Sequence, residues 1–297
     1  MKQLDMIIEL KAPNSSENFK QFLEKIECLI DRTNRVSIVS KPSTLSESSF
    51  DSNYYFANFL TELKPNIEIL FHLTCRDLNK VNIQPRLCLL KSLGIKQLLV
   101  VTGDNYCRPA EDGELHFLDS NELVSYIADN CNWFKSLGVA GYPGGNGKQS
   151  QNNSEELLRL RTKLLAGANV IYTQCLFDLK AYEEFVNEVK VRFERVDIVP
   201  SVAVFDSSNA LERILVLTRV ASLPSTQLIT DNLRKQLSCC NAEQAELVAE
   251  CYLTNVLSSI RKLQSSKCTI DLCTFGSYKL AEKLVGSLYS NYKLPQS

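Results

Sequence analysis

The chain has 297 residues, with 33 Lys and Arg against 34 Asp and Glu, and its formal net charge is -1. With 44% hydrophobic and 23% charged residues, the composition excludes a largely disordered protein. The balanced charge argues against a dedicated nucleic-acid-binding protein, which would carry a basic surface. Surface scaling predicts that about three-quarters of the unfolded chain's surface is buried on folding, which suffices for one large domain or two small ones.

The sequence predicts neither a membrane helix nor a secretory leader. No stretch approaches the roughly 18 uncharged apolar residues that a membrane helix needs, and charged residues interrupt the first thirty positions. The 11 cysteines are odd in number and contain no Cys-x-x-Cys pair. We therefore expect reduced, mostly buried thiols in a cytoplasmic protein, without a dedicated zinc or other metal site.

Short apolar runs alternate with segments of helical periodicity along the chain. The runs predicted as strands are residues 4–10, 35–40, 67–73, 96–101, 138–142, 169–175, 196–202 and 269–275. The segments predicted as helices are 16–31, 78–93, 120–135, 154–166, 178–193, 207–220, 226–238 and 242–263. Strands that are apolar on both faces and alternate with helices indicate a covered parallel sheet. Eight such units predict an α/β fold, a (β/α)8 TIM barrel with extra helices before the last strand; a doubly wound open sheet is the alternative.

In a barrel of this class, the active site lies where the strands end and the loops toward the helices begin. Six of the eight units carry polar residues there, namely Glu9, Ser40, His72 with Thr74, Gly103 with Asp104, Tyr142, and Gln174 with Asp178. The seventh and eighth runs offer little at that point. This convergence predicts a functional site at the carboxyl ends of the strands.

Several of these residues also have a purely structural interpretation. Glu9 is either a strand-end carboxylate exposed to water or a partly buried general acid with a raised pKa. Gly103 and Asp104 suit an ordinary turn, and His72 suits a buried structural histidine.

The glycine-rich stretch 141–147 lacks the spacing of a Walker loop, and the chain contains no Gly-x-Gly-x-x-Gly sequence. A glycine-rich loop that runs into a helix can nevertheless offer backbone N–H groups to a phosphate. The helix that follows carries Arg159, Arg161 and Lys163, of which one or two could add charged contacts, although a solvated helix face is the usual interpretation.

Taken in order, several strand ends resemble a known family. The similar segments are IEILFHLTCRD (core 68–77), LLVVTGD (98–104), GVAGYPGGN (138–146), LLRLRTKLLAGAN (157–169) and IYTQCLFD (171–178). They resemble the flavin-containing barrel of methylenetetrahydrofolate reductases, and the similarity extends over nearly the whole chain. The resemblance implies one FAD-binding (β/α)8 domain over residues 1–297, without a C-terminal regulatory domain. It also implies that NADH or NADPH reduces 5,10-methylenetetrahydrofolate to 5-methyltetrahydrofolate through FAD, in one-carbon metabolism and methionine synthesis.

The resemblance assigns roles to individual residues. Glu9 is implied to protonate the folate as its five-membered ring opens, Asp104 to lie near flavin and folate, and Gln174 to bind folate and nicotinamide. The positions implied to contact FAD are Ser40, His72, Thr102, Gly103, Asp104, Tyr142, Asn146, Glu156, Arg159 and Lys163.

Some positions depart from the family pattern. Thr102 and Ser277 stand where the family has arginines, and Asn146 stands where it has a histidine. Two alternatives therefore stay open: a barrel without turnover that acts as a binding or regulatory partner, and a flavoprotein with another substrate. The expected partner is a small folate, with neither nucleic acid nor membrane, and the sequence leaves open whether the protein is a homo-oligomer.

Overall fold

The computed structural model describes residues 4–290, except 14–17, 41–48, 104–105, 108, 111–112, 147–152, 221–222 and 264–267. The strands are all parallel and belong to one sheet, in the order β7-β6-β5-β4-β3-β2-β1-β9-β8. Their bounds are β1 Leu4–Lys11, β2 Arg35–Val39, β3 Glu68–Thr74, β4 Gln97–Val101, β5 Ser136–Gly141, β6 Val170–Thr173, β7 Asp197–Val199, β8 Ser201–Ala203 and β9 Cys268–Cys273.

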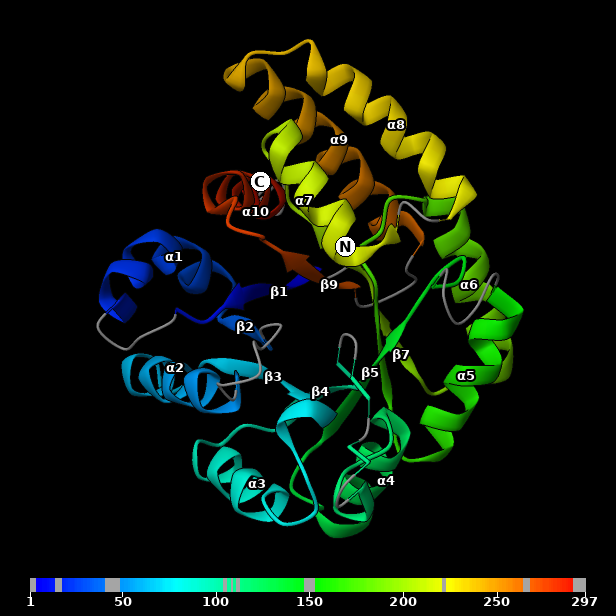
Figure 1. The fold of residues 1–297 in the computed structure, drawn as a ribbon. Helices are drawn as coiled ribbons and strands as arrows, with labels where there is room; N and C mark the ends of the chain where they lie inside the picture. The colour runs from blue at the N-terminus through cyan, green and yellow to red at the C-terminus, as the bar shows by residue number, and fades with distance from the viewer. Residues whose placement is uncertain are drawn as a thin grey trace, which may run out of the picture.

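Helices surround the sheet on its outer side (Figure 1). Their bounds are α1 Phe19–Thr33, α2 Ser49–Leu63, α3 Ile83–Ser92, α4 Ser120–Asn130, α5 Asn153–Leu165, α6 Leu179–Arg192, α7 Ser208–Thr218, α8 Pro224–Ser238, α9 Ala242–Leu263 and α10 Tyr278–Ser290, with short 3-10 turns at Cys75–Asp77 and Gly113–Leu115. Each helix buries an apolar face against the sheet or a neighbouring helix. Pro224 occupies the first turn of α8, where its missing N–H costs no hydrogen bond.

The sheet closes into a barrel at Pro200, which separates β7 from β8. β7 pairs with β6, and β8 pairs with β9, so these two short strands join the opposite ends of the sheet. The Pro200 carbonyl accepts a hydrogen bond from the Asp271 N–H at 2.9 Å, and the Ser201 N–H donates to Thr173 Oγ1 at 3.0 Å. The single strand predicted over 196–202 is wrong, because the chain changes its pairing partner at a residue that cannot donate to a ladder.

An apolar layer fills the middle of the barrel. It consists of Ile7, Leu70, Leu99, Val170, Tyr172 and Val199. Gly138 makes room for the Tyr172 ring, since a Cβ at position 138 would lie 2.6 Å from Cε2 of that ring. The larger apolar cluster lies between the strands and the helices. Because the interior is filled in this way, the space at the carboxyl ends of the strands has a closed floor.

The structure confirms the predicted α/β barrel, including the extra helices α8 and α9 before the last strand. Two helices, α2 and α10, were not predicted from the sequence. In α10 the buried residues recur every three or four positions, at Leu280, Ala281, Leu284, Val285 and Leu288. Among the described residues, no helix combines the length and the hydropathy needed to cross a membrane.

Candidate active site

A cavity of about 1170 Å³ opens at the carboxyl ends of the strands. The predicted site residues that line it are Glu9, Ser40, His72, Thr74, Thr102, Gly103, Tyr142, Asn146, Glu156, Arg159, Lys163, Gln174 and Asp178. Asp104, predicted as a catalytic and ligand-binding residue, lies outside the described residues. The structure therefore brings these described candidates into one cavity, whereas Arg161 is exposed and lies outside its lining.

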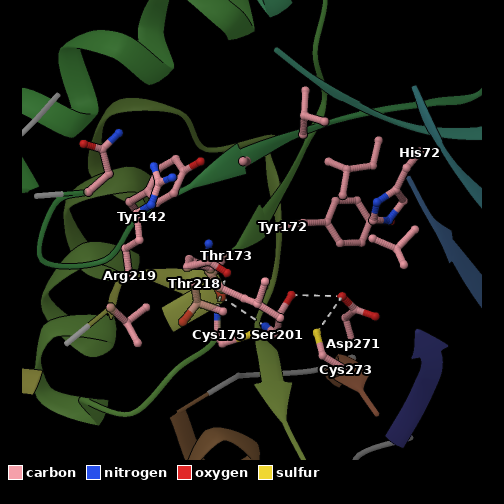
Figure 2. A pocket seen from close by; sticks show the side chains of 18 of the residues that line it. His72, Tyr142, Tyr172, Thr173, Cys175, Ser201, Thr218, Arg219, Asp271 and Cys273 are labelled. Carbon is pink, nitrogen blue, oxygen red and sulfur yellow. Dashed lines mark hydrogen bonds between the residues drawn. The ribbon is translucent and has the colours of Figure 1, made fainter. Parts of the chain in front are cut away.

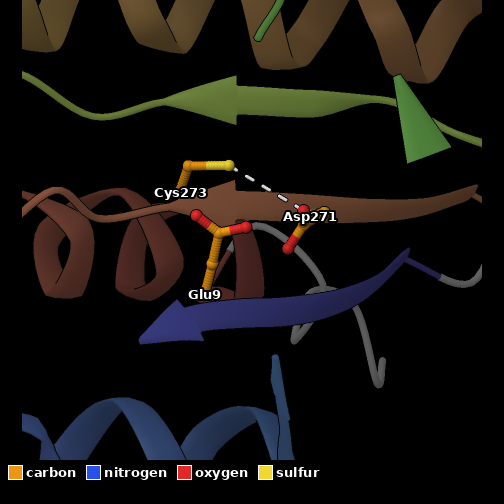
Figure 3. A group of neighbouring side chains, drawn as sticks. All are labelled: Glu9, Asp271 and Cys273. Carbon is orange, nitrogen blue, oxygen red and sulfur yellow. Dashed lines mark hydrogen bonds between the residues drawn. The ribbon is translucent and has the colours of Figure 1, made fainter. Parts of the chain in front are cut away.

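Two acidic side chains meet at the top of the barrel. Glu9 projects from β1, and Asp271 and Cys273 project from the neighbouring strand β9 (Figure 3). One carboxylate oxygen of each acid and the Cys273 Sγ lie within 4.8 Å of one another. Asp271 is 1% exposed, while Glu9 is only partly buried. Glu9 is therefore the member of the pair that is more accessible to a ligand in the cavity.

Asp271 is held by donors from two strands. Its Oδ2 accepts hydrogen bonds from Ser201 Oγ at 3.0 Å and from Cys273 Sγ at 3.8 Å (Figure 2). Its Oδ1 is buried and has no hydrogen-bond partner among the described residues. The main chain of Glu9 is also fixed, because its carbonyl accepts a hydrogen bond from Thr274 Oγ1 at 2.8 Å.

The surroundings favour a proton on Glu9 at neutral pH. Burial, followed by the negative charge of Asp271, raises the pKa of Glu9 to about 8, while the Cys273 thiol acts in the opposite direction. Burial also raises the pKa of Asp271, and its hydrogen bonds and the charge of Arg35 oppose this rise. Of the two sequence-based interpretations of Glu9, the structure agrees with the partly buried carboxyl. A carboxylic acid that titrates near neutrality is suited to donate a proton.

His72 forms part of the cavity wall and is held in place by two serines. Its Nε2 lies 2.8 Å from Ser37 Oγ, and Ser40 Oγ donates to the His72 carbonyl at 3.1 Å, which ties β2 to β3. Burial lowers the pKa of His72 to about 3, so the ring is neutral at physiological pH. A neutral imidazole can take part in hydrogen bonds with a ligand but provides no positive charge.

Positive charge reaches the cavity from α5 instead. Lys163 Nζ donates to the Ala140 carbonyl at 2.9 Å and lies 6.0 Å from the ring centroid of Tyr142. Burial lowers the pKa of Lys163, and the nearby carboxylate of Glu156 opposes this effect. Arg159, one turn earlier on the same helix, also lines the cavity. Two cations on one side of a cavity are suited to bind phosphate groups.

Three of the predicted site residues also hold the backbone in place. Thr102 Oγ1 accepts a hydrogen bond from the N–H of Ser120, at the start of α4, at 3.0 Å. Gln174 Oε1 accepts the N–H of Cys175 at 3.0 Å, a bond that does not involve the side-chain NH₂ group of Gln174. Asp178 caps α6 by accepting two backbone N–H groups in its first turn.

The expectation that the seventh and eighth runs offer little at the site is wrong. Ser201, Asp271 and Cys273 line the cavity from these runs. The expectation rested on the last positions of each predicted strand, whereas Asp271 lies inside the predicted strand 269–275. An aspartate within an otherwise apolar strand, two positions before a cysteine on the same face, is the signal that could have identified the pair.

Three arginines at the cavity were also missed, of which Arg76 follows β3 and the other two lie near α7. Arg213 and Arg219 line it from α7 and from the residue that ends this helix. Arg213 Nη2 donates to the Phe275 carbonyl at 2.6 Å, close in sequence to Ser277. Ser277 itself is 3% exposed, and the cavity lining does not include it. The rim of the cavity thus has positive charge despite the serine at position 277.

Comparisons with solved structures agree with the barrel. A triple mutant of Plasmodium falciparum HPPK-DHPS superposes with a TM-score of 0.53 at 11% identity, over 99% of this chain and 48% of that chain. The 2,3-dimethylmalate lyase superposes with a TM-score of 0.50 at 8% identity, over 98% of this chain and 82% of that chain. At such low identity, these similarities concern the fold alone.

Sequence comparisons are more specific. "Probable methylenetetrahydrofolate reductase (NADPH)" of Caenorhabditis elegans is 25% identical, over 78% of this chain and 34% of the relative. Methylenetetrahydrofolate reductase 2 of Schizosaccharomyces pombe is 28% identical, over 76% and 38%. Methylenetetrahydrofolate reductase (NADH) 1 of Zea mays is 27% identical, over 68% and 37%. The chain thus spans less than half the length of these three relatives.

The family model for methylenetetrahydrofolate reductase matches residues 2–275, which is most of the chain. This match covers Glu9, His72, Gln174 and Asp271. The chain belongs to the methylenetetrahydrofolate reductase family.

Proposed function

We propose that this protein reduces 5,10-methylenetetrahydrofolate to 5-methyltetrahydrofolate with NADH or NADPH, through FAD bound in the barrel cavity. The observation that carries this proposal is the position of Glu9, a carboxyl with a raised pKa, in the same cavity as Gln174 and the cations of α5. The family supports the reaction class. The relatives are named for NADPH in one case and NADH in another, so both reductants are included.

The cavity residues fit a flavin dinucleotide. The volume of about 1170 Å³ exceeds the roughly 300–1,000 Å³ of ordinary small-molecule sites, which suits a long cofactor next to a second ligand. Lys163 and Arg159 would bind its phosphates, and Ser40, His72 and Tyr142 would provide hydrogen bonds and ring contacts. Glu156, Asn146, Thr102 and Gly103 complete the wall.

Glu9 supplies the proton that the reaction consumes. FAD, whose phosphates Lys163 and Arg159 would hold, would supply the two-electron hydride chemistry between the nicotinamide and the folate. Opening the five-membered folate ring breaks a carbon–nitrogen bond, and the nitrogen that leaves needs a proton. Glu9 holds that proton near neutral pH and donates it to this nitrogen, and water restores it afterwards.

The remaining polar residues orient the substrates. The side-chain NH₂ group of Gln174, which lines the cavity, would donate hydrogen bonds to the folate or the nicotinamide in turn, because the proposed reaction brings both to the same flavin one after the other. Arg213 and Arg219 are suited to the carboxylates that a folate carries. Asp104 would help to hold the folate, as the family resemblance implies.

The purified protein provides the test. We expect a yellow protein with about one FAD per chain, which oxidises NADH or NADPH with menadione as acceptor and reduces 5,10-methylenetetrahydrofolate. A protein that stays colourless after incubation with FAD would overturn the proposal. If the protein reduces menadione but no folate, the proposed flavin site would stand and the proposed substrate would be wrong.

A further inference from the structure

The carboxyl pair of Glu9 and Asp271 is asymmetric, and this asymmetry decides where a shared proton resides. Oδ2 of Asp271 accepts hydrogen bonds from the Ser201 hydroxyl and the Cys273 thiol. The thiol also lowers the pKa of Glu9, so the Ser201 hydroxyl is the donor that distinguishes Asp271 from Glu9. Donors of this kind stabilise an ionised carboxylate. The charge of Arg35, on β2, acts in the same direction. Glu9 opens to the cavity and faces the negative charge of Asp271, which favours its protonated form.

The other titratable groups near the pair leave this assignment unchanged. Tyr172, on β6, faces Asp271, and burial raises the pKa of its hydroxyl, so it stays neutral. Cys273, on β9, has a pKa raised by its hydrogen bond with Cys175 and by burial, so it is a neutral thiol beside the pair. Within the part of the chain that the structure describes, the proton near neutral pH is therefore shared between the carboxyls of Glu9 and Asp271.

We propose that Asp271 is a positioning residue: its carboxylate, fixed by Ser201 and Cys273, keeps the acidic proton of the pair on Glu9, where it faces the substrate. This inference rests on the proposed function of Glu9. Without Asp271, Glu9 would still be partly buried but would lose the adjacent negative charge that opposes its ionisation. Its proton would then be lost at lower pH, and less of the protein would be competent to protonate the folate.

The first experiment compares the pH profiles of two half-reactions in the FAD-loaded protein. Asp271→Asn keeps the shape of the side chain and its acceptor oxygen but removes the charge. In the pH–rate profile of folate reduction, we expect the decline at alkaline pH to begin about one pH unit or more lower than in the wild type. Above that pH, the rate of folate reduction divided by the rate of menadione reduction should fall about tenfold. Asp129→Asn, an exposed substitution of the same type on α4, should leave both profiles unchanged.

A second variant covers the case in which Asp271→Asn fails to fold. Ser201→Ala keeps both carboxyls and removes one donor to Asp271. The proton then shifts partly to Asp271, and the same rate ratio should fall about three- to tenfold. An unchanged ratio and an unmoved alkaline limb in the folded variants would show that Asp271 does not act through Glu9.

Infrared spectroscopy tests the pair without FAD or folate. A protonated carboxylic acid gives a carbonyl band that disappears on ionisation. We expect a band that titrates near pH 8 in the wild-type protein to be lost in Glu9→Gln, which keeps only the band of Asp271 at or below about pH 7, and to titrate at lower pH in Asp271→Asn. A band that still titrates near pH 8 in Glu9→Gln would overturn the assignment of the proton, as would a stoichiometric divalent metal ion that is lost in Asp271→Asn. A wild-type protein without folate reduction would refute the proposed function while this titration still tests the pair.

Discussion

Replacing Glu9 by glutamine tests the proposed proton donor. The substitution keeps the size of the side chain and removes the proton that titrates near pH 8. General acid catalysis typically contributes a factor of about 10²–10⁴, and we expect kcat for folate reduction to fall by that factor. NAD(P)H oxidation with menadione needs no proton for a folate nitrogen and should change by less than about threefold. Equal losses of rate in both assays would refute the role of Glu9 as proton donor, since they would indicate damage to flavin binding.

The same substitution changes how stability depends on pH. The folded protein keeps the Glu9 proton up to about pH 8, whereas the unfolded chain loses it near the ordinary value of 4.5. Unfolding therefore becomes easier as pH rises through this window. A pKa shift of one unit corresponds to about 1.4 kcal/mol, but water in the cavity and coupling to Asp271 weaken the effect. We therefore expect the free energy of unfolding to fall by about 1–2 kcal/mol over this pH range. In urea unfolding, the free energy of unfolding of Glu9→Gln should depend less on pH than that of the wild type. An equally steep dependence on pH would contradict the raised pKa of Glu9.

Three further substitutions test the cavity and its floor. Lys163→Met should weaken FAD binding about tenfold or more in a fluorescence titration, while Arg161→Met on the same helix should not; equal effects would exclude a specific phosphate contact. Arg213→Ala should raise the KM for the folate about three- to tenfold without changing that for NAD(P)H, and Arg192→Ala, on the outside of the barrel, serves as its control. Gly138→Ala should cost about 1–3 kcal/mol in urea unfolding, because its Cβ would meet the tyrosine ring 2.6 Å away; a neutral effect would mean that the floor repacks freely.

The barrel could be predicted because its strands are apolar on both faces and alternate with helices. The closure at Pro200 could not, since a strand that pairs with one neighbour in its first half and another in its second has the same local pattern as an ordinary strand. The two missed helices are a different case. Buried residues recur at helical spacing in both, from Phe50 to Leu60 in α2 and from Leu280 to Leu288 in α10, so the sequence contained the signal.

The site was predictable where polar residues lie in the last two positions of the runs predicted as strands, as Glu9, His72 and Gln174 do. Asp271 was not, because its importance depends on which carboxyl the neighbouring strand places beside it. Parallel pairing of β1 with β9 connects positions more than 260 residues apart, and no local pattern encodes that register. The same holds for Arg213, which reaches the cavity only because α7 packs beside the end of β9.

A single-turnover reaction tests whether the reduced flavin in this protein reduces 5,10-methylenetetrahydrofolate. FAD-loaded protein is reduced anaerobically with one equivalent of NADH or NADPH and then mixed with 5,10-methylenetetrahydrofolate. The account predicts that the flavin absorbance returns and that about one equivalent of 5-methyltetrahydrofolate forms per flavin. A flavin that stays reduced with the folate but is promptly reoxidised by menadione would contradict it.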